Sequence, residues 1–130
     1  MKAVRSLLIA ATLALTCQTS GSALAGKYTE YGEGTVSCGT YVQAAERQRI
    51  SGSSVRYLQF TGFTNGYLTA LNWMASAVGV QDGTYKNIMQ GTDLEGQMLW
   101  LENYCRQHPL SDFGVAVSEL VIVLTKQANK

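Results

Sequence analysis

Cys105 and His108 lie three residues apart and beside Pro109, the only proline of the chain. Three residues along a helix place two side chains on one face, where a thiolate and an imidazole can act as nucleophile and base. The same residue types also bind zinc, and cysteines of exported proteins commonly form disulfides. The stretch "LENYCRQHPL" therefore has three interpretations: a catalytic pair, part of a metal site, or a disulfide at the end of a helix.

The first 25 residues have the pattern of an export signal. Lys2 and Arg5 precede the apolar run at 7–16, and the sequence "ALA" at 23–25 is a small-x-small cleavage site. This run is shorter than the roughly 20 residues of a membrane-spanning helix. We expect cleavage after Ala25 and a periplasmic or secreted product with no membrane span.

Lipidation at Cys17 is the alternative for the N-terminus. The apolar residues before Cys17 suit a lipoprotein signal, but Thr16 is bulkier than the residue expected directly before a lipidated cysteine. We therefore favour the conventional signal peptide.

Cleavage leaves Cys38 and Cys105, and an isolated pair in an oxidising compartment normally forms a disulfide. That bond removes the nucleophile. A zinc site would lack the usual C-x-x-C or H-x-x-x-H pairs, and His108 suits the carbonyls that end a helix. The chain also has no G-x-S-x-G sequence and no phosphate-binding glycine loop. We expect no enzyme activity, no metal and no cofactor.

Length and charge point to one small domain that does not bind nucleic acid. Removing 25 of the 130 residues leaves 105, enough for a single core. Eight basic against nine acidic residues then remain, so the mature chain offers nothing that attracts nucleic acid or an anionic membrane.

The apolar periodicity predicts an all-α domain of four helices at 37–130, preceded by a flexible arm or irregular lead-in at 26–36. Ser37 caps a first helix that ends before "SGSS", and Thr92 with Glu95 forms the capping box of a third. His108 and Pro109 end the third helix, and Ser111 caps the last. The Cys38–Cys105 disulfide would join the start of the first helix to the end of the third.

The second helix is predicted at 55–78, with two lines of residues along it. Its large apolar residues suggest a buried stripe: Leu58, Phe63, Tyr67, Leu71, Met74 and Val78. Gly62, Gly66 and Ala70 form a smooth line along which another backbone can approach closely.

The connection from Gly79 to Gly91 is long for so small a domain, and such loops are usually functional or mobile. Tyr85, Ile88 and Met89 place apolar side chains in it, where they contact a partner or fold back over the core; both interpretations stay open. Trp73 and Trp100 lie off the predicted stripes and are expected in or near the core.

The segments "GFTNGYLTALNW" at 62–73 and "GTDLEGQMLWLENYCRQHPL" at 91–110 resemble a group of small periplasmic proteins of proteobacteria. The group includes the HdeA/HdeB acid-stress chaperones and the Tai-type immunity proteins, which neutralise peptidoglycan amidases delivered by type VI secretion. The chain is similar over about 36–125, although its cysteines lie further apart than in HdeA-like proteins and it lacks their lysine-rich tail.

The resemblance implies a protein-binding function. Immunity proteins usually block an active site with a protruding loop, which on this chain implies 79–91, with Tyr85, Ile88 and Met89 as contacts. The alternatives are an acid-activated holdase, whose HdeA-like relatives are dimers that loosen at low pH, and an envelope structural factor. The expected partner is an effector enzyme or an unfolded client, and a homodimer stays open.

Overall fold

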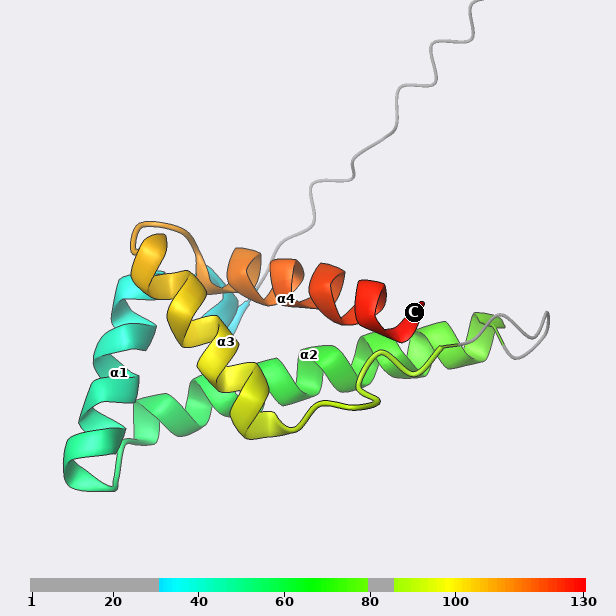
Figure 1. The fold of residues 1–130 in the computed structure, drawn as a ribbon. Coiled ribbons are helices and arrows are strands. Elements are labelled where there is room, and N and C mark those ends of the chain that lie inside the picture. Colours follow the sequence, from blue (N-terminus) through cyan, green and yellow to red (C-terminus); the bar gives the residue numbers. More distant parts are fainter. Residues whose placement is uncertain (1–30, 80–85) are drawn as a thin grey trace, which may run out of the picture.

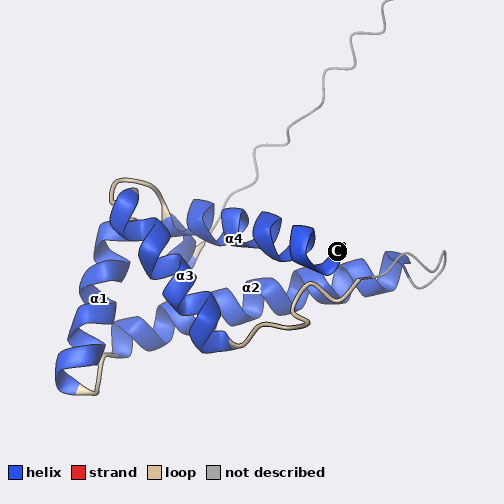
Figure 2. Ribbon diagram, viewed as in Figure 1, coloured by secondary structure: helices blue, strands red, loops and turns tan. Residues whose placement is uncertain are grey.

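The computed structural model describes residues 31–79 and 86–130, and these form an all-helical domain (Figures 1 and 2). The elements in chain order are η1 (Gly32–Thr35), α1 (Cys38–Ser51), α2 (Val55–Gly79), α3 (Leu94–Gln107) and α4 (Phe113–Ala128). Within the described residues there are four α-helices and no strand, only an isolated bridge between Ser37 and Asp112. The predicted fold class is confirmed.

The first helix begins and ends as its sequence predicts. The Ser37 hydroxyl accepts a hydrogen bond from the Thr40 N–H at 3.3 Å, which caps the helix. Gly52 ends it in the left-handed conformation, with φ of 67°, and its N–H donates to the Gln48 carbonyl at 2.9 Å. A residue with a β-carbon would be strained at this turn.

The third and fourth helices begin one residue later than predicted. Asp93, not Thr92, caps α3, because its carboxylate reaches the Gly96 N–H at 2.7 Å. Asp112 precedes α4, while the Ser111 carbonyl accepts from the Cys38 N–H at 2.8 Å. Capping side chains next to each other in sequence compete for the same N–H groups, so local sequence leaves the register open by one residue.

The core forms where α1, α2 and α4 meet around three aromatic rings. The Tyr41 ring centroid lies 5.2 Å from that of Phe60 and 4.7 Å from that of Phe113, and Phe60 and Phe113 are also 4.7 Å apart. The Tyr41 hydroxyl donates to the Met98 carbonyl at 2.8 Å, which satisfies the buried phenol and brings in α3. Tyr41 therefore contacts all the other helices.

The buried side of α2 agrees with the predicted stripe only in part: Phe63, Tyr67 and Leu71 pack against the core, as predicted. Phe60, Thr64 and Leu68 are fully buried, whereas Leu58 and Met74 are exposed. The Thr64 hydroxyl donates to the Phe60 carbonyl at 3.0 Å, so this polar residue costs little inside the core. The face of α2 that packs against the other helices is therefore the one on which Phe60 contacts Tyr41 and Phe113.

The described end of the predicted arm or irregular lead-in, residues 32–36, lies against the helices. Residues 32–35 form η1, in which Gly34 is buried, and the Val36 carbonyl accepts from the Phe113 N–H at 2.8 Å. Glu33 also forms an ion pair with Arg56 at 3.2 Å. Through these contacts, residues 33–36 pack against α2 and α4. Residues 26–30 and the predicted signal peptide lie outside the described residues.

Candidate interaction surface

Cys105 carries no thiol, because its sulfur is bonded to that of Cys38 at 2.03 Å and both residues are fully buried. The predicted disulfide between the start of α1 and the last turn of α3 is confirmed. His108 caps α3 at the surface, with its ring centroid 4.5 Å from that of Tyr104. Within 31–79 and 86–130, no group of three or more His, Cys, Asp or Glu residues is placed to hold a metal ion.

The predicted binding residues of the loop are only partly accessible. Ile88 is 8% exposed and belongs to the core, and Met89 packs against the core. The Asn72 side-chain oxygen accepts from the Ile88 N–H at 3.2 Å, which holds this turn against α2. Ile88 therefore folds back over the core and Met89 does so in part, and contact of Met89 with a partner stays a prediction. Tyr85 lies outside the described residues.

The outward side of α2 is a continuous uncharged face of small, apolar and a few polar residues, which we call the α2 strip. Every third or fourth residue is exposed along it: Val55, Gln59, Gly62, Gly66, Ala70, Trp73 and Ala77. Because an α-helix has 3.6 residues per turn, this spacing keeps all seven on one side. Leu58 and Met74 are exposed on its two flanks.

The middle of the α2 strip is a shallow groove of about 590 Å³, with Trp73 at one end. A β-carbon placed on Gly62 or Gly66 would meet no atom within 4 Å. We predicted that another backbone lies close to the line of Gly62, Gly66 and Ala70. No described segment of this chain does so. Trp73 is 70% exposed and Met74 57%, so the expectation that Trp73 lies in or near the core is wrong.

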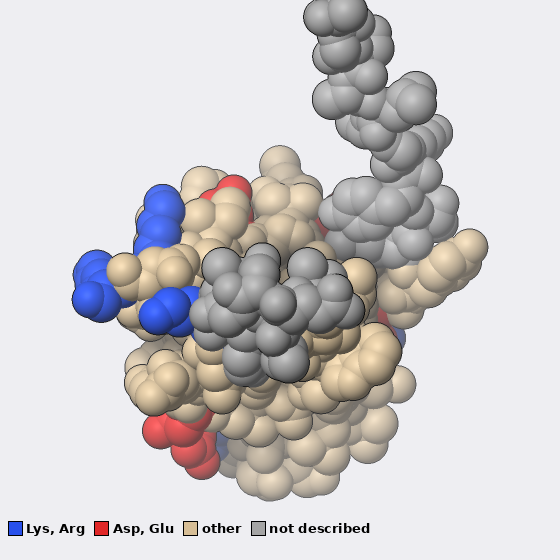
Figure 3. All heavy atoms as spheres, turned by 90° about the vertical axis from the view of Figure 1, so that its right-hand side faces the viewer, with Lys and Arg blue, Asp and Glu red and all other residues tan. Residues whose placement is uncertain are grey.

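The α2 strip also carries no charge. No residue between Arg56 and the end of α2 at Gly79 is acidic or basic. Figure 3 views the molecule onto the end where α2 and α4 finish, and the Lys and Arg side chains gather at one side of this view. Asp and Glu side chains gather mainly at the lower left of the same view, and most of the other described surface in it belongs to uncharged residues. Charged residues are usually rare at the centre of a protein interface, and the α2 strip is an exposed face without any.

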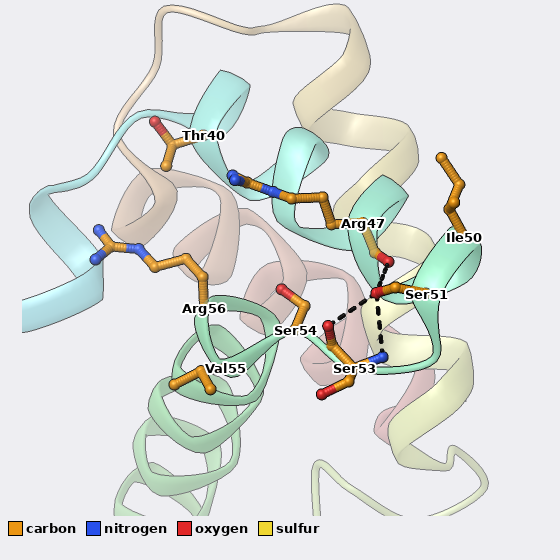
Figure 4. Close-up of a pocket in the computed structure, with 8 residues that line it drawn as sticks. All are labelled: Thr40, Arg47, Ile50, Ser51, Ser53, Ser54, Val55 and Arg56. Carbon is orange, nitrogen blue, oxygen red and sulfur yellow. Dashed lines mark hydrogen bonds between the residues drawn. The ribbon is translucent and has the colours of Figure 1, made fainter.

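A second hollow lies between the end of α1 and the start of α2, with a volume of about 600 Å³ (Figure 4). Arg47 and Arg56 line it, together with several hydroxyl side chains. The Ser51 hydroxyl already donates to the carbonyls of Arg47 and Ser53, at 2.7 and 2.9 Å. Arg56 also forms an ion pair with Glu33, and two arginines make this hollow more polar than the α2 strip, which is the stronger candidate surface.

A cluster of ion pairs joins α1 to α3 at Glu102. Its side chain is 14% exposed and accepts from Arg49 at 2.5 Å and from Arg106 at 2.6 Å. Burial alone would raise the pKa of Glu102, but the hydrogen bonds and charges of Arg106 and Arg49 outweigh it and hold this pKa below its ordinary value. Glu46 pairs with the same two arginines, so the cluster is a structural contact between helices.

No family model matches this chain, and neither a curated protein nor a solved structure is significantly similar to it. No helix in the described parts of the chain has the length and apolar content that a membrane crossing requires. The disulfide is compatible with a location outside the cytoplasm. The α2 strip therefore has to be interpreted from its own chemistry.

Proposed function

We propose that this protein is a non-catalytic protein-binding module that is exported by its N-terminal segment and binds through the α2 strip. One observation carries the proposal: an uncharged helix face with Trp73 largely in solvent. Tryptophan gains more than most residues when an interface covers it, because its large ring loses contact with water at little entropic cost. The oxidised cysteines add support, since they leave no thiol for catalysis.

Within this class we favour an inhibitor of the immunity type, whose partner is an effector enzyme. The reason is the resemblance of 62–73 and 91–110 to Tai-type proteins, and the first of these segments includes most of the α2 strip. We first predicted that the loop at 79–91 blocks the active site of the effector. Ile88 and Met89 are poor contacts for that purpose, because both pack against the core. We therefore move the proposed contact from the loop to the α2 strip.

The test is inhibition of a peptidoglycan amidase of the type VI class, sought among the genes on either side of this one. Purified protein should inhibit hydrolysis, and Trp73→Ser should weaken inhibition by about tenfold or more, as for a central interface residue. Ile122→Ser on α4 is the matched control, because Ile122 is also exposed but lies off the α2 strip. An amidase unaffected by wild-type protein would rule out the inhibitor function.

The acid-activated holdase is the second candidate, supported by the Glu102 cluster. Protonation of Glu102 in acid would remove the ion pair between Arg49 of α1 and Glu102 of α3. The Cys38–Cys105 disulfide opposes opening, because it joins the same two helices. Protection of an aggregating client at about pH 2–3, with none at neutral pH, would favour the holdase over the inhibitor.

A further inference from the structure

We infer that the hollow between the end of α1 and the start of α2 binds a phosphate group, carried by a small organic molecule or by a lipid headgroup. This is the hollow of about 600 Å³ that Arg47 and Arg56 line (Figure 4). The inference goes beyond the proposed function and does not rest on it. Three observations support it: hydrogen-bond donors without acceptors, an excess of positive charge, and the start of a long helix.

The two arginines of the hollow have most of their N–H groups unused. Each guanidinium carries five N–H donors and no acceptor. Among the described residues the Arg47 side chain makes one hydrogen bond, from its Nε to the Gln43 carbonyl at a long 3.4 Å. The Arg56 Nε lies 3.2 Å from the Glu33 Oε2, but the two atoms are not aligned as a hydrogen bond. The hollow therefore offers donors to a ligand that brings acceptors.

Ser54 adds an unused donor on a nearly buried residue. It is 9% exposed, and its hydroxyl oxygen accepts from the Tyr57 N–H at 3.2 Å. None of the described groups accepts the hydroxyl proton, and Figure 4 shows this hydroxyl pointing toward the Arg47 side chain. A buried donor without an acceptor is costly. A bound oxyanion would supply the acceptor.

The hollow also includes the first turn of α2, a helix of 25 residues. The N–H groups of Val55 and Arg56 begin this helix, and neither donates to a described residue. They carry the positive end of the helix dipole, which stabilises a nearby anion. Of the described carboxylates, that of Glu33 alone pairs with an arginine of the hollow, so the two arginines leave an excess of positive charge.

The arrangement of the donors favours phosphate over carboxylate. A carboxylate has two oxygens in one plane, and a single guanidinium satisfies both. Here the donors come from α1 through Arg47, from the connecting turn through Ser54 and from α2 through Arg56, which suits the oxygens of a tetrahedral group. Ile50 and Val55 are exposed and also line the hollow, where they can contact the organic part of the ligand.

This hollow lies far from the centre of the α2 strip. Val55 belongs to both, but Trp73 is eighteen residues further along α2, about 27 Å at 1.5 Å per residue. A phosphate bound between α1 and α2 therefore leaves the groove beside Trp73 accessible to a protein partner.

The test is titration of the full chain with glycerol 3-phosphate and with inorganic phosphate at low salt, followed by amide NMR. We expect a dissociation constant on the order of 1 mM or lower, because so small a ligand makes few contacts. The largest shifts should occur at the N–H groups of Val55 and Arg56, and the Gly66 N–H should not shift. Acetate, the carboxylate control, should bind about tenfold more weakly or less. Acetate bound as tightly as phosphate would overturn the inference.

Two substitutions should change phosphate binding in opposite directions. Arg47→Gln should weaken it about tenfold or more and keep the fold, because Arg47 is exposed and makes no ion pair with a described residue. Glu33→Gln should tighten it severalfold, because it removes the negative charge beside Arg56. Lys126→Gln is the matched control, since it removes an exposed positive charge near the end of α4. An equal loss of binding in Lys126→Gln would overturn the inference, because net charge would then explain the attraction.

Vesicles distinguish the two sources of the phosphate group. Sedimentation with vesicles of phosphatidic acid, against vesicles of phosphatidylcholine, tests the lipid headgroup. Binding of glycerol 3-phosphate that depends on Arg47 assigns a small organic phosphate, whether or not the vesicles bind. Arg47-dependent binding to phosphatidic acid alone assigns the headgroup. Absence of Arg47-dependent binding in both assays would overturn the inference and leave the proposed inhibitor function untouched.

Discussion

Reduction of the Cys38–Cys105 disulfide is the perturbation whose effect the structure predicts most directly. The bond joins residues 67 positions apart, from the first turn of α1 to the last turn of α3. For a loop of that length, loss of the restraint on the unfolded chain lowers the free energy of unfolding by about 4 kcal/mol. A domain of this size has a total stability of only about 5–15 kcal/mol, so reduction removes a large share of it.

The assay is urea unfolding, followed by helical circular dichroism, with and without a phosphine reductant. With an m-value of about 1–2 kcal/mol/M, the midpoint should fall by about 2–4 M on reduction, while m changes little if the unfolded state stays expanded. Reduction leaves both sulfur atoms in place, so it separates the restraint from the packing of the side chains.

A double variant, Cys38→Ala with Cys105→Ala, is the control for the reductant. It should unfold at or below the midpoint of the reduced protein, because it also leaves a small cavity, and the reductant should have no effect on it. A loss of less than about 1 kcal/mol on reduction of the wild type would refute the reasoning, since the unfolded chain would then gain little freedom when the bond opens.

Two further predictions concern side chains that join the helices. Tyr41→Phe should lower the free energy of unfolding by about 1 kcal/mol in denaturant titrations, because it loses the buried bond to the Met98 carbonyl but keeps the ring contacts; the same change at the exposed Tyr31 should have no effect, and an equal effect would contradict the prediction. Glu102→Gln should destabilise the protein at neutral pH. Since the folded pKa of Glu102 is below its unfolded value of about 4.3, the stability it contributes is complete above that pH and is lost as pH falls through the folded value. The difference between wild type and variant, measured by thermal unfolding from neutral pH into acid, should therefore shrink toward zero, and a difference that grows in acid would contradict the assignment.

The signals that sequence reads well on this chain are local. The Ser37 hydroxyl caps α1 by accepting from the Thr40 N–H, and α1 ends at Ser51, within one residue of the end predicted before "SGSS". Pro109 requires the helix before it to stop, and α3 does end at Gln107. The disulfide followed from cysteine count and export alone. Each of these conclusions needs only a few neighbouring residues or the compartment.

The side of α2 that is buried could be read only in part from its sequence. A helix face is predicted from the contrast between polar and apolar sides, and α2 is uncharged all round beyond Arg56. The predicted stripe was therefore right at Phe63, Tyr67 and Leu71, which pack against the core, and wrong at Leu58 and Met74, which are exposed. The contact of Phe60 with Tyr41 and Phe113, on two other helices, decided which side is buried.

Sequence by itself thus determined the helical class, the ends of the helices to within a residue and the covalent link between α1 and α3. Only the tertiary structure decided that Ile88 turns inward, that Glu102 is shielded, and that Trp73 and the glycines of α2 face outward. The physical reason is the distance along the sequence between the residues that interact. Caps and turns are fixed by interactions within a few residues, whereas burial depends on which side chains, distant in sequence, fill the same volume.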